Sequence, residues 1–225
     1  MFSIFRKNPA DAELARIYKE KGFYCDEYVE AFRAAHPRLR SDDHFTLCEL
    51  YIGMEKYDSA SKELLSVRPG SLLDIITPAQ HAFCRIAISL GSGDYSDALA
   101  IYNEHVKFLD TFMSNPVRSK IAGDYYSYAA ILCAIEGKDT SDREIERYLA
   151  RLREWCDLFP RHRLLLSITE VAVLYAKKEK EAEAAAAKCR QTILDFASFN
   201  YEWEREEYLK KLDRATRITP EAPAH

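Results

Sequence analysis

The chain has 225 residues, of which 48% are hydrophobic and 30% are charged, and its formal net charge is −4. This length and apolar content are enough for a sizeable buried core, while so mild an acidic balance is not typical of proteins that bind nucleic acid or anionic membranes. No apolar run approaches the roughly 18 residues that cross a bilayer. We therefore expect no nucleic-acid partner and no membrane.

The first residues, MFSIFRKNPADAE, include two basic side chains but no following apolar segment. We therefore expect no secretory signal and a cytoplasmic protein, in which the six cysteines are reduced thiols. No two cysteines lie within four residues of each other, a spacing that argues against a zinc site. The sequence predicts no metal, no cofactor and no catalytic residue.

Prolines and glycines divide the chain into blocks that each have room for two helices. Proline inside a helix removes a hydrogen bond and clashes with the preceding turn, so prolines should mark helix starts and ends. These block boundaries are Pro9, Pro37, Pro69, Pro78, Pro116 and Pro160. Glycines near the middle of a block are expected to end a helix in a left-handed cap. They are Gly22, Gly53, Gly91, Gly93 and Gly137.

Apolar residues recur at helical spacing on both sides of these glycines. Clear examples, in chain order, are Leu14 with Tyr18, Val29 with Phe32, Leu47 with Tyr51, Tyr57 with Ala60, Ile86 with Leu90, Tyr95 with Ala98, Ala129 with Cys133, Ile145 with Leu149, Ile168 with Ala172, and Cys189 with Ile193. We predict an all-α fold of five helical hairpins and one further helix, from about Tyr201 to Arg217. Residues 1–217 are expected to form one domain and 218–225 a disordered tail.

Two of these blocks resemble the tetratricopeptide repeat, a helix–turn–helix unit of roughly 34 residues with signature residues at fixed offsets. Leu47 and Cys48 match its Leu-Gly pair, Tyr51 its next tyrosine, and Tyr57 with Ala60 its turn tyrosine and alanine. The pattern returns at Tyr95 and Ala98, and the similarity is clearest over residues 44–110. It implies a right-handed α–α superhelix with a capping C-terminal helix, in which stacked hairpins share one core.

The resemblance also implies a binding surface, because the first helix of each pair in this family lines a concave face where peptides lie. The corresponding residues are Phe45, Glu49, Ile52, His81, Cys84, Ile88, Asp124, Ser127, Ile131, Thr169 and Val173. Chaperone-binding members use asparagine, lysine and arginine there to clamp a peptide's terminal carboxylate. This chain has Glu49, Ile88, Ile131 and Val173 at the asparagine positions, which argues against such a clamp and favours an amphipathic helix in an apolar groove.

Three functions remain open from the sequence. The first is a non-enzymatic scaffold that binds a protein or peptide in the groove. The second is a regulatory or immunity-type protein that sequesters one dedicated partner through another surface. The third is an enzyme built on a helical solenoid, which would need His81, Cys84 and either Asp124 or Glu49 to converge.

The final predicted helix has three alternative roles. It can cap the stack with a polar outer face, fold back into the groove, or mediate an interaction such as a homodimer contact. Its aromatic and apolar residues lie among dense charges in the segment YEWEREEYLKKLDRATRI.

Overall fold

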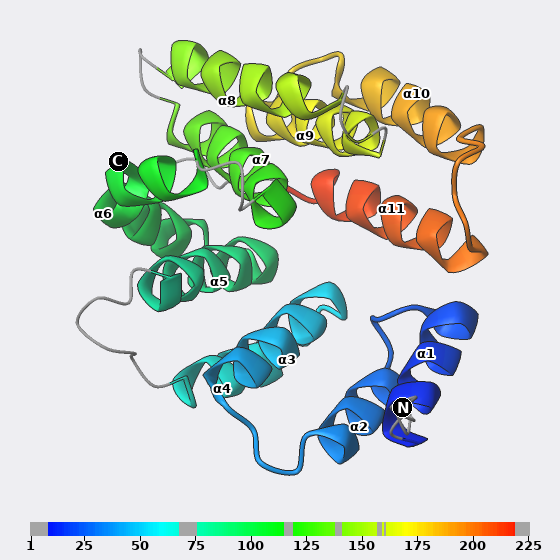
Figure 1. The fold of residues 1–225 in the computed structure, drawn as a ribbon. Coiled ribbons are helices and arrows are strands. Elements are labelled where there is room, and N and C mark those ends of the chain that lie inside the picture. Colours follow the sequence, from blue (N-terminus) through cyan, green and yellow to red (C-terminus); the bar gives the residue numbers. More distant parts are fainter. Residues whose placement is uncertain are drawn as a thin grey trace.

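The structure is a computed structural model that describes residues 9–67, 76–114, 119–137, 141–156, 159 and 161–218. Those residues form eleven α-helices and no strand (Figure 1), which confirms the all-α prediction. The helices are α1 (Pro9–Lys21), α2 (Asp26–Ala35), α3 (Ser41–Gly53), α4 (Tyr57–Leu65), α5 (Ile76–Ser92), α6 (Tyr95–Met113), α7 (Ser119–Glu136), α8 (Ser141–Cys156), α9 (His162–Ala176), α10 (Ala182–Leu194) and α11 (Glu202–Ala215).

Proline positions agree with helix boundaries wherever the structure describes them. Pro9 is the first residue of α1, and Pro78 lies in the first turn of α5, where a missing backbone N–H costs no internal hydrogen bond. Pro37 lies between α2 and α3. Pro69, Pro116 and Pro160 fall outside the described residues.

Glycines act in two different ways at the helix ends. Gly22 follows α1 with φ +82° and Gly93 follows α5 with φ +83°, so both adopt the predicted left-handed conformation. Gly137 does so too, with φ +63°, but the prediction is wrong for Gly53 and Gly91, which are still helical; the positive φ of the turn after α3 falls on Glu55. Gly53 instead makes space, because a Cβ atom there would lie 2.2 Å from the Tyr24 ring.

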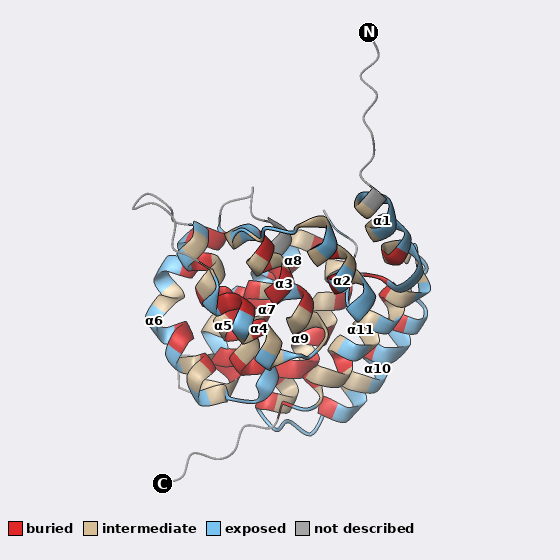
Figure 2. Cartoon of the chain, turned by 90° about the horizontal axis from the view of Figure 1, so that it is seen from below, coloured by how far each residue is buried: buried red, intermediate tan, exposed pale blue. Residues whose placement is uncertain are grey.

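Each helix packs against its neighbour in the chain, giving the pairs α1–α2, α3–α4, α5–α6, α7–α8 and α9–α10. The odd-numbered helices also contact one another in the order α3, α5, α7, α9 and α11. Ala60, Ala98 and Ala130 have no exposed surface, as expected for small residues where helices approach closely. The main core extends from α3 to α11, and buried residues gather around α5 and α7 in Figure 2, whereas α6 and α10 carry many exposed residues.

The two ends of the described chain meet through aromatic side chains. Tyr18 of α1 lies 5.2 Å from Trp203 of α11, measured between ring centroids, and 5.6 Å from Tyr201. Phe23, in the turn after α1, lies 6.0 Å from Trp203. We call these four residues the closing cluster. Through it, Trp203 of α11 contacts the N-terminal helix pair, and α11 also packs against α9 and α10.

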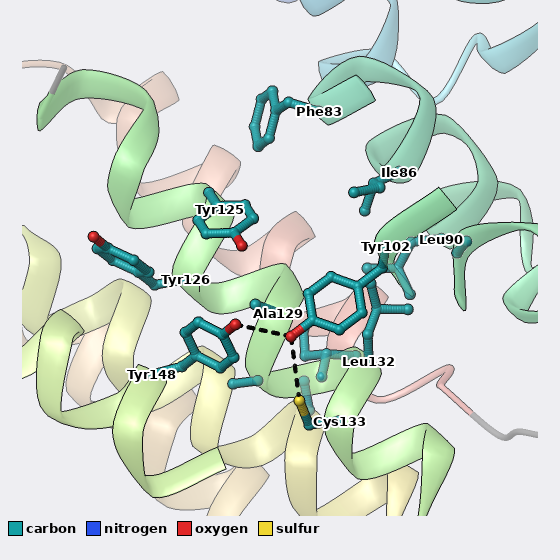
Figure 3. Close-up of a cluster of buried hydrophobic side chains, with 14 of the residues drawn as sticks. Phe83, Ile86, Leu90, Tyr102, Tyr125, Tyr126, Ala129, Leu132, Cys133 and Tyr148 are labelled. Atoms are coloured by element: carbon teal, nitrogen blue, oxygen red, sulfur yellow. Dashed lines mark hydrogen bonds between the residues drawn. The ribbon is translucent and has the colours of Figure 1, made fainter. Parts of the chain in front are cut away.

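A network of buried hydroxyl groups joins α6, α7 and α8 (Figure 3). The Tyr102 and Tyr148 hydroxyl oxygens are 2.8 Å apart, and the Tyr102 oxygen lies 3.6 Å from the Cys133 sulfur. Asp110 of α6 accepts hydrogen bonds from the Tyr125 hydroxyl at 2.6 Å and from the Tyr148 hydroxyl at 3.0 Å. We call this set the tyrosine network. It satisfies polar groups that would otherwise be costly inside the core.

The fit of Gly22 against the closing cluster leads to a prediction about stability. A Cβ atom on Gly22 would lie 2.6 Å from the Trp203 ring and would also strain the positive φ. We expect Gly22→Ala to lower the free energy of unfolding by about 2–3 kcal/mol, measured by urea denaturation. Gly93→Ala is the matched control, because its φ is +83° and no atom lies within 4 Å of its Cβ position. Equal losses in the two variants would show that the Trp203 contact does not matter.

None of the helices in the described ranges has both the length and the apolar character that a membrane span requires. The predicted tail, 218–225, lies outside the described residues except for Ile218, which is 8% exposed and therefore belongs to the fold.

Candidate functional site

A cavity of about 470 Å³ lies among five odd-numbered helices, α3, α5, α7, α9 and α11. This volume is in the range of small-molecule pockets, or of a few side chains of a bound polypeptide. Its apolar wall includes Ile52, Phe83, Leu90, Ile131, Leu165 and Ile168. Its charged groups are Glu49, Glu55, Asp124, Lys211, Arg214 and Arg217.

Five of the eleven residues that the sequence placed on the binding face line this cavity. They are Glu49, Ile52, Asp124, Ser127 and Ile131. Four others are core residues that are at most 8% exposed, and these are Phe45, Cys84, Thr169 and Val173. His81 and Ile88 are partly exposed and lie outside the cavity lining.

In α5 the residues that line the cavity lie on a different face of the helix from the residues that the sequence predicted. Phe83, Ala87 and Leu90 line the cavity, whereas the predicted Cys84 lies in the core and Ile88 packs against the core from one side. One residue corresponds to about 100° of rotation around a helix, so a small register difference exchanges the two faces. The apolar residues of α5 surround most of the helix, and the sequence pattern alone does not separate its two buried faces.

The polar residues on α7 and α9 have different environments. Ser127 and Thr169 share a hydrogen bond of 2.7 Å between their hydroxyl oxygens, and Thr169 also donates to the Leu165 carbonyl at 2.8 Å. This pair joins the two helices at the cavity wall. Asp124, one turn earlier on α7, faces the cavity itself.

The basic side of the cavity comes from α11 and was not predicted from the sequence. Arg214 and Arg217 lie 3.8 Å and 3.5 Å from Glu55 in the turn after α3, and Lys211 lies 3.1 Å from Glu207. Burial lowers the pKa of Lys211, but the nearby Asp124 and Glu207 carboxylates outweigh burial and raise it. The signal in the sequence was the spacing of three and four residues, which places Lys211, Arg214 and Ala215 on one face of α11.

The acidic side consists of Glu49 on α3 and Asp124 on α7. Removal of the Glu49 carboxyl from bulk water, and secondarily the Asp124 charge, raise the pKa of Glu49 to about 7. Glu49 is an exposed residue, although protein groups crowd its carboxyl on the cavity side. Within the described part of the chain, the Glu49 carboxyl group makes no hydrogen bond and no ion pair. A carboxyl group whose pKa lies near neutral pH therefore faces the cavity.

This raised pKa predicts a change in the pH dependence of stability. The folded-state pKa of Glu49 lies above its ordinary value of 4.5, so its contribution is complete below pH 4.5 and is lost as pH rises through about 7. Glu49→Gln has no charge to bury. We expect this variant to gain stability over the natural protein between pH 5 and pH 8, by about 1 kcal/mol after allowance for solvent screening. Urea denaturation across this pH range measures the gain.

Glu30→Gln provides the control for that measurement, because Glu30 is an exposed carboxyl on α2 outside the cavity. Its stability should follow that of the natural protein at every pH. If the free energy of unfolding of Glu49→Gln changes with pH in the same way as that of the natural protein, then the Glu49 carboxyl titrates as it would in water.

The cysteine and histidine that would serve an enzyme have separate environments. Cys84 has no exposed surface, and hydrogen bonding to Cys48, burial and the charge of Glu49 raise the pKa of its thiol. Burial also lowers the pKa of the partly exposed His81. All six cysteines are free thiols, and the described residues contain no cluster of three or more side chains that could hold a metal ion.

A second cavity, of about 540 Å³, lies between the N-terminal helix pair and α11. It shares Tyr24, Gly53, Glu55 and Arg214 with the first cavity, so the two are direct neighbours. Its other lining residues are mostly charged and of both signs.

In comparisons with known proteins, no family model, no curated protein and no solved structure matches the chain. The similarity to the tetratricopeptide repeat therefore stays a prediction from the signature residues.

Proposed function

We propose that this protein is a non-enzymatic, cytoplasmic helical-repeat protein that binds a protein or peptide segment in the cavity. The arrangement proposed is a right-handed superhelix of the tetratricopeptide type, with the odd-numbered helices on its inner side. The observation that carries the proposal is an apolar cavity lined by successive helices of that row. A groove of this kind suits the apolar face of an amphipathic segment.

The position of α11 limits what the cavity can hold. Lys211, Arg214 and Ala215 of this helix line the cavity, so the protein's own C-terminal helix forms part of the cavity wall. This agrees with the fold-back alternative for the last helix. The space that remains fits a few side chains of a bound segment better than a whole helix.

The proposal predicts that a charge on the apolar wall abolishes binding. Random dodecamer peptides displayed on phage are selected against the immobilised full chain, and the enriched peptides are synthesised and titrated by fluorescence anisotropy. We expect Ile52→Asp to weaken the binding of these peptides at least thirtyfold, because Ile52 lines the cavity and an aspartate there would be desolvated by a bound apolar side chain. Ile52→Ala, which keeps the wall apolar, should weaken it only a few fold.

Leu65→Asp is the matched control, because Leu65 is 85% exposed and lies outside the cavity lining. Circular dichroism establishes that every variant is folded. If no peptide is enriched over the empty support, the proposed function is wrong. If peptides bind equally to Ile52→Asp, the partner uses another surface, as in the sequestering alternative.

A further inference from the structure

The charges around the cavity are not evenly compensated. On the basic side, Arg214 and Arg217 share the single carboxylate of Glu55, and Lys211 lies beside Glu207. On the acidic side, Asp124 is close enough to Lys211 to raise the pKa of that amine. Glu49 has no such cation among the groups that influence it. The lining as a whole holds three acidic and three basic residues, and Glu49 is the acidic residue that has no cation beside it among the described residues.

Aromatic rings lie beside this acidic side. Tyr24, Phe83 and Tyr128 all line the cavity, and the Phe83 and Tyr128 rings stack with their centroids 5.6 Å apart. Both Glu49 and Asp124 act electrostatically on Tyr24, and burial raises the pKa of the Tyr24 hydroxyl to about 12, so this phenol stays neutral at physiological pH. Aromatic faces attract cations through their quadrupole, and the attraction strengthens in desolvated sites.

A carboxylate, aromatic rings and an apolar wall in one cavity match the chemistry of a basic side chain. Lysine and arginine bury their methylene stems against apolar surface and keep the charged end beside a polar group. An acidic or neutral side chain would leave Glu49 without a counter-charge. A purely apolar side chain would bury this carboxyl further and increase its desolvation cost.

We propose that the cavity holds a lysine or arginine side chain of the bound polypeptide, with the cationic end against Glu49 and the stem against Ile52 and Phe83. This inference rests on the proposed function and names the side chain that anchors the partner. It differs from a carboxylate clamp, because the recognised charge is positive and belongs to a side chain.

Such binding should depend on pH. Glu49 is faced by Asp124 from α7, by Tyr24 from the N-terminal helix pair and by Cys84 from α5, and Lys211 of α11 is next to Asp124 and Tyr24. Below about pH 7 the Glu49 carboxyl takes up a proton and loses its attraction for a cation. An alkylammonium ion keeps its charge throughout this range. Affinity for a cation should therefore fall about tenfold from pH 8 to pH 6.

The test uses three probes of the same length: hexylammonium, hexanol and hexanoate. Each is titrated into the full chain with labelled isoleucine methyl groups, and the methyl signals of Ile52 and Ile131 are followed by NMR. We expect hexylammonium to bind with a dissociation constant of the order of 1 mM. Hexanol should bind at least tenfold more weakly, and hexanoate should not bind measurably.

Variants assign that selectivity to the acidic side of the cavity. Glu49→Gln should weaken hexylammonium binding about tenfold and remove its pH dependence, while hexanol binding stays the same or improves. Asp124→Asn is the second variant and should have a smaller effect, because Lys211 already neutralises Asp124 in part. Glu30→Gln is the control and should leave all three probes unchanged. Equal binding of hexylammonium and hexanol, or selectivity that survives in Glu49→Gln, would overturn the inference.

The peptide selection separates this inference from the proposed function. Enriched peptides with an essential lysine or arginine, whose replacement by norleucine weakens binding at least tenfold, support both. Enriched peptides that bind in the cavity without any basic residue leave the function standing and refute the basic anchor. Selection of no peptide refutes the proposed function, whatever the alkyl probes show.

Discussion

Replacement of Glu204 by alanine is expected to detach α11 from the rest of the fold. The Glu204 residue is 3% exposed, and its carboxylate accepts hydrogen bonds from Arg161 at 2.6 Å and 3.0 Å. It also accepts backbone N–H bonds from Asn200 at 2.7 Å and Tyr201 at 3.3 Å, which cap the start of the helix. Removing it leaves Arg161 and these donors without their acceptor. We expect a loss of about 3 kcal/mol.

Hydrogen exchange measured by mass spectrometry locates that loss. Amides of α11 should exchange at least a hundredfold faster in Glu204→Ala, while those of α7 and α8 keep their protection, because α11 can open as a local unit. Glu202→Ala is the matched control: Glu202 lies in the same first turn and pairs with Arg205 at 2.6 Å, but its side chain is 72% exposed. Such surface pairs contribute at most about 1 kcal/mol. Similar exchange in both variants would contradict the anchoring role of Glu204.

Replacement of Asp110 by alanine should produce the second large effect, in this case on global stability. Asp110 accepts hydrogen bonds from Tyr125 and Tyr148, each 1% exposed, and lies 3.1 Å from Arg147. Its loss leaves two buried hydroxyl groups short of an acceptor, at about 1–3 kcal/mol each. We expect Asp110→Ala to lower the free energy of unfolding by about 3 kcal/mol, measured by urea denaturation.

A double-mutant cycle with Tyr148→Phe tests whether the tyrosine network acts as a unit. The two substitutions together should cost less than the sum of the single ones, because the phenylalanine no longer needs the lost acceptor. Asp142→Ala serves for comparison, since Asp142 is 77% exposed and pairs with Lys177 at 2.9 Å on the surface. Additive losses for Asp110 and Tyr148 would show that the hydroxyl groups contribute independently.

The helices were predictable because their signals are local. Apolar residues at helical spacing and prolines at the boundaries act within one block of sequence. Gly123 lies inside α7, where a glycine has no local reason. In the structure a Cβ atom on Gly123 would lie 2.9 Å from the Nε2 atom of His162 at the start of α9. The close approach of α7 and α9 requires a glycine at this position. The sequence pattern within one block carries no information about such a contact.

The candidate site was predictable only in part, for a related reason. Glu49 and Ile52 were found because the signature residues fix the register of α3, and Ile131 was found by carrying the family positions over to α7. The face of α5 was missed because this helix is apolar around most of its circumference. The basic residues of α11 were missed because their role depends on the position of that helix relative to the other helices. The sequence of α11 alone does not reveal this position.

The closing cluster joins the first and last helices that the structure describes, so neither helix can complete its packing without the other. Tyr18 and Phe23 are synthesised long before Tyr201 and Trp203, yet their rings pack together. During translation the aromatic side chains of the N-terminal pair therefore remain without their α11 contacts until that helix has left the ribosome. Contacts between such distant segments slow folding, so a chain that stops before α11 should be a target for chaperones and proteases.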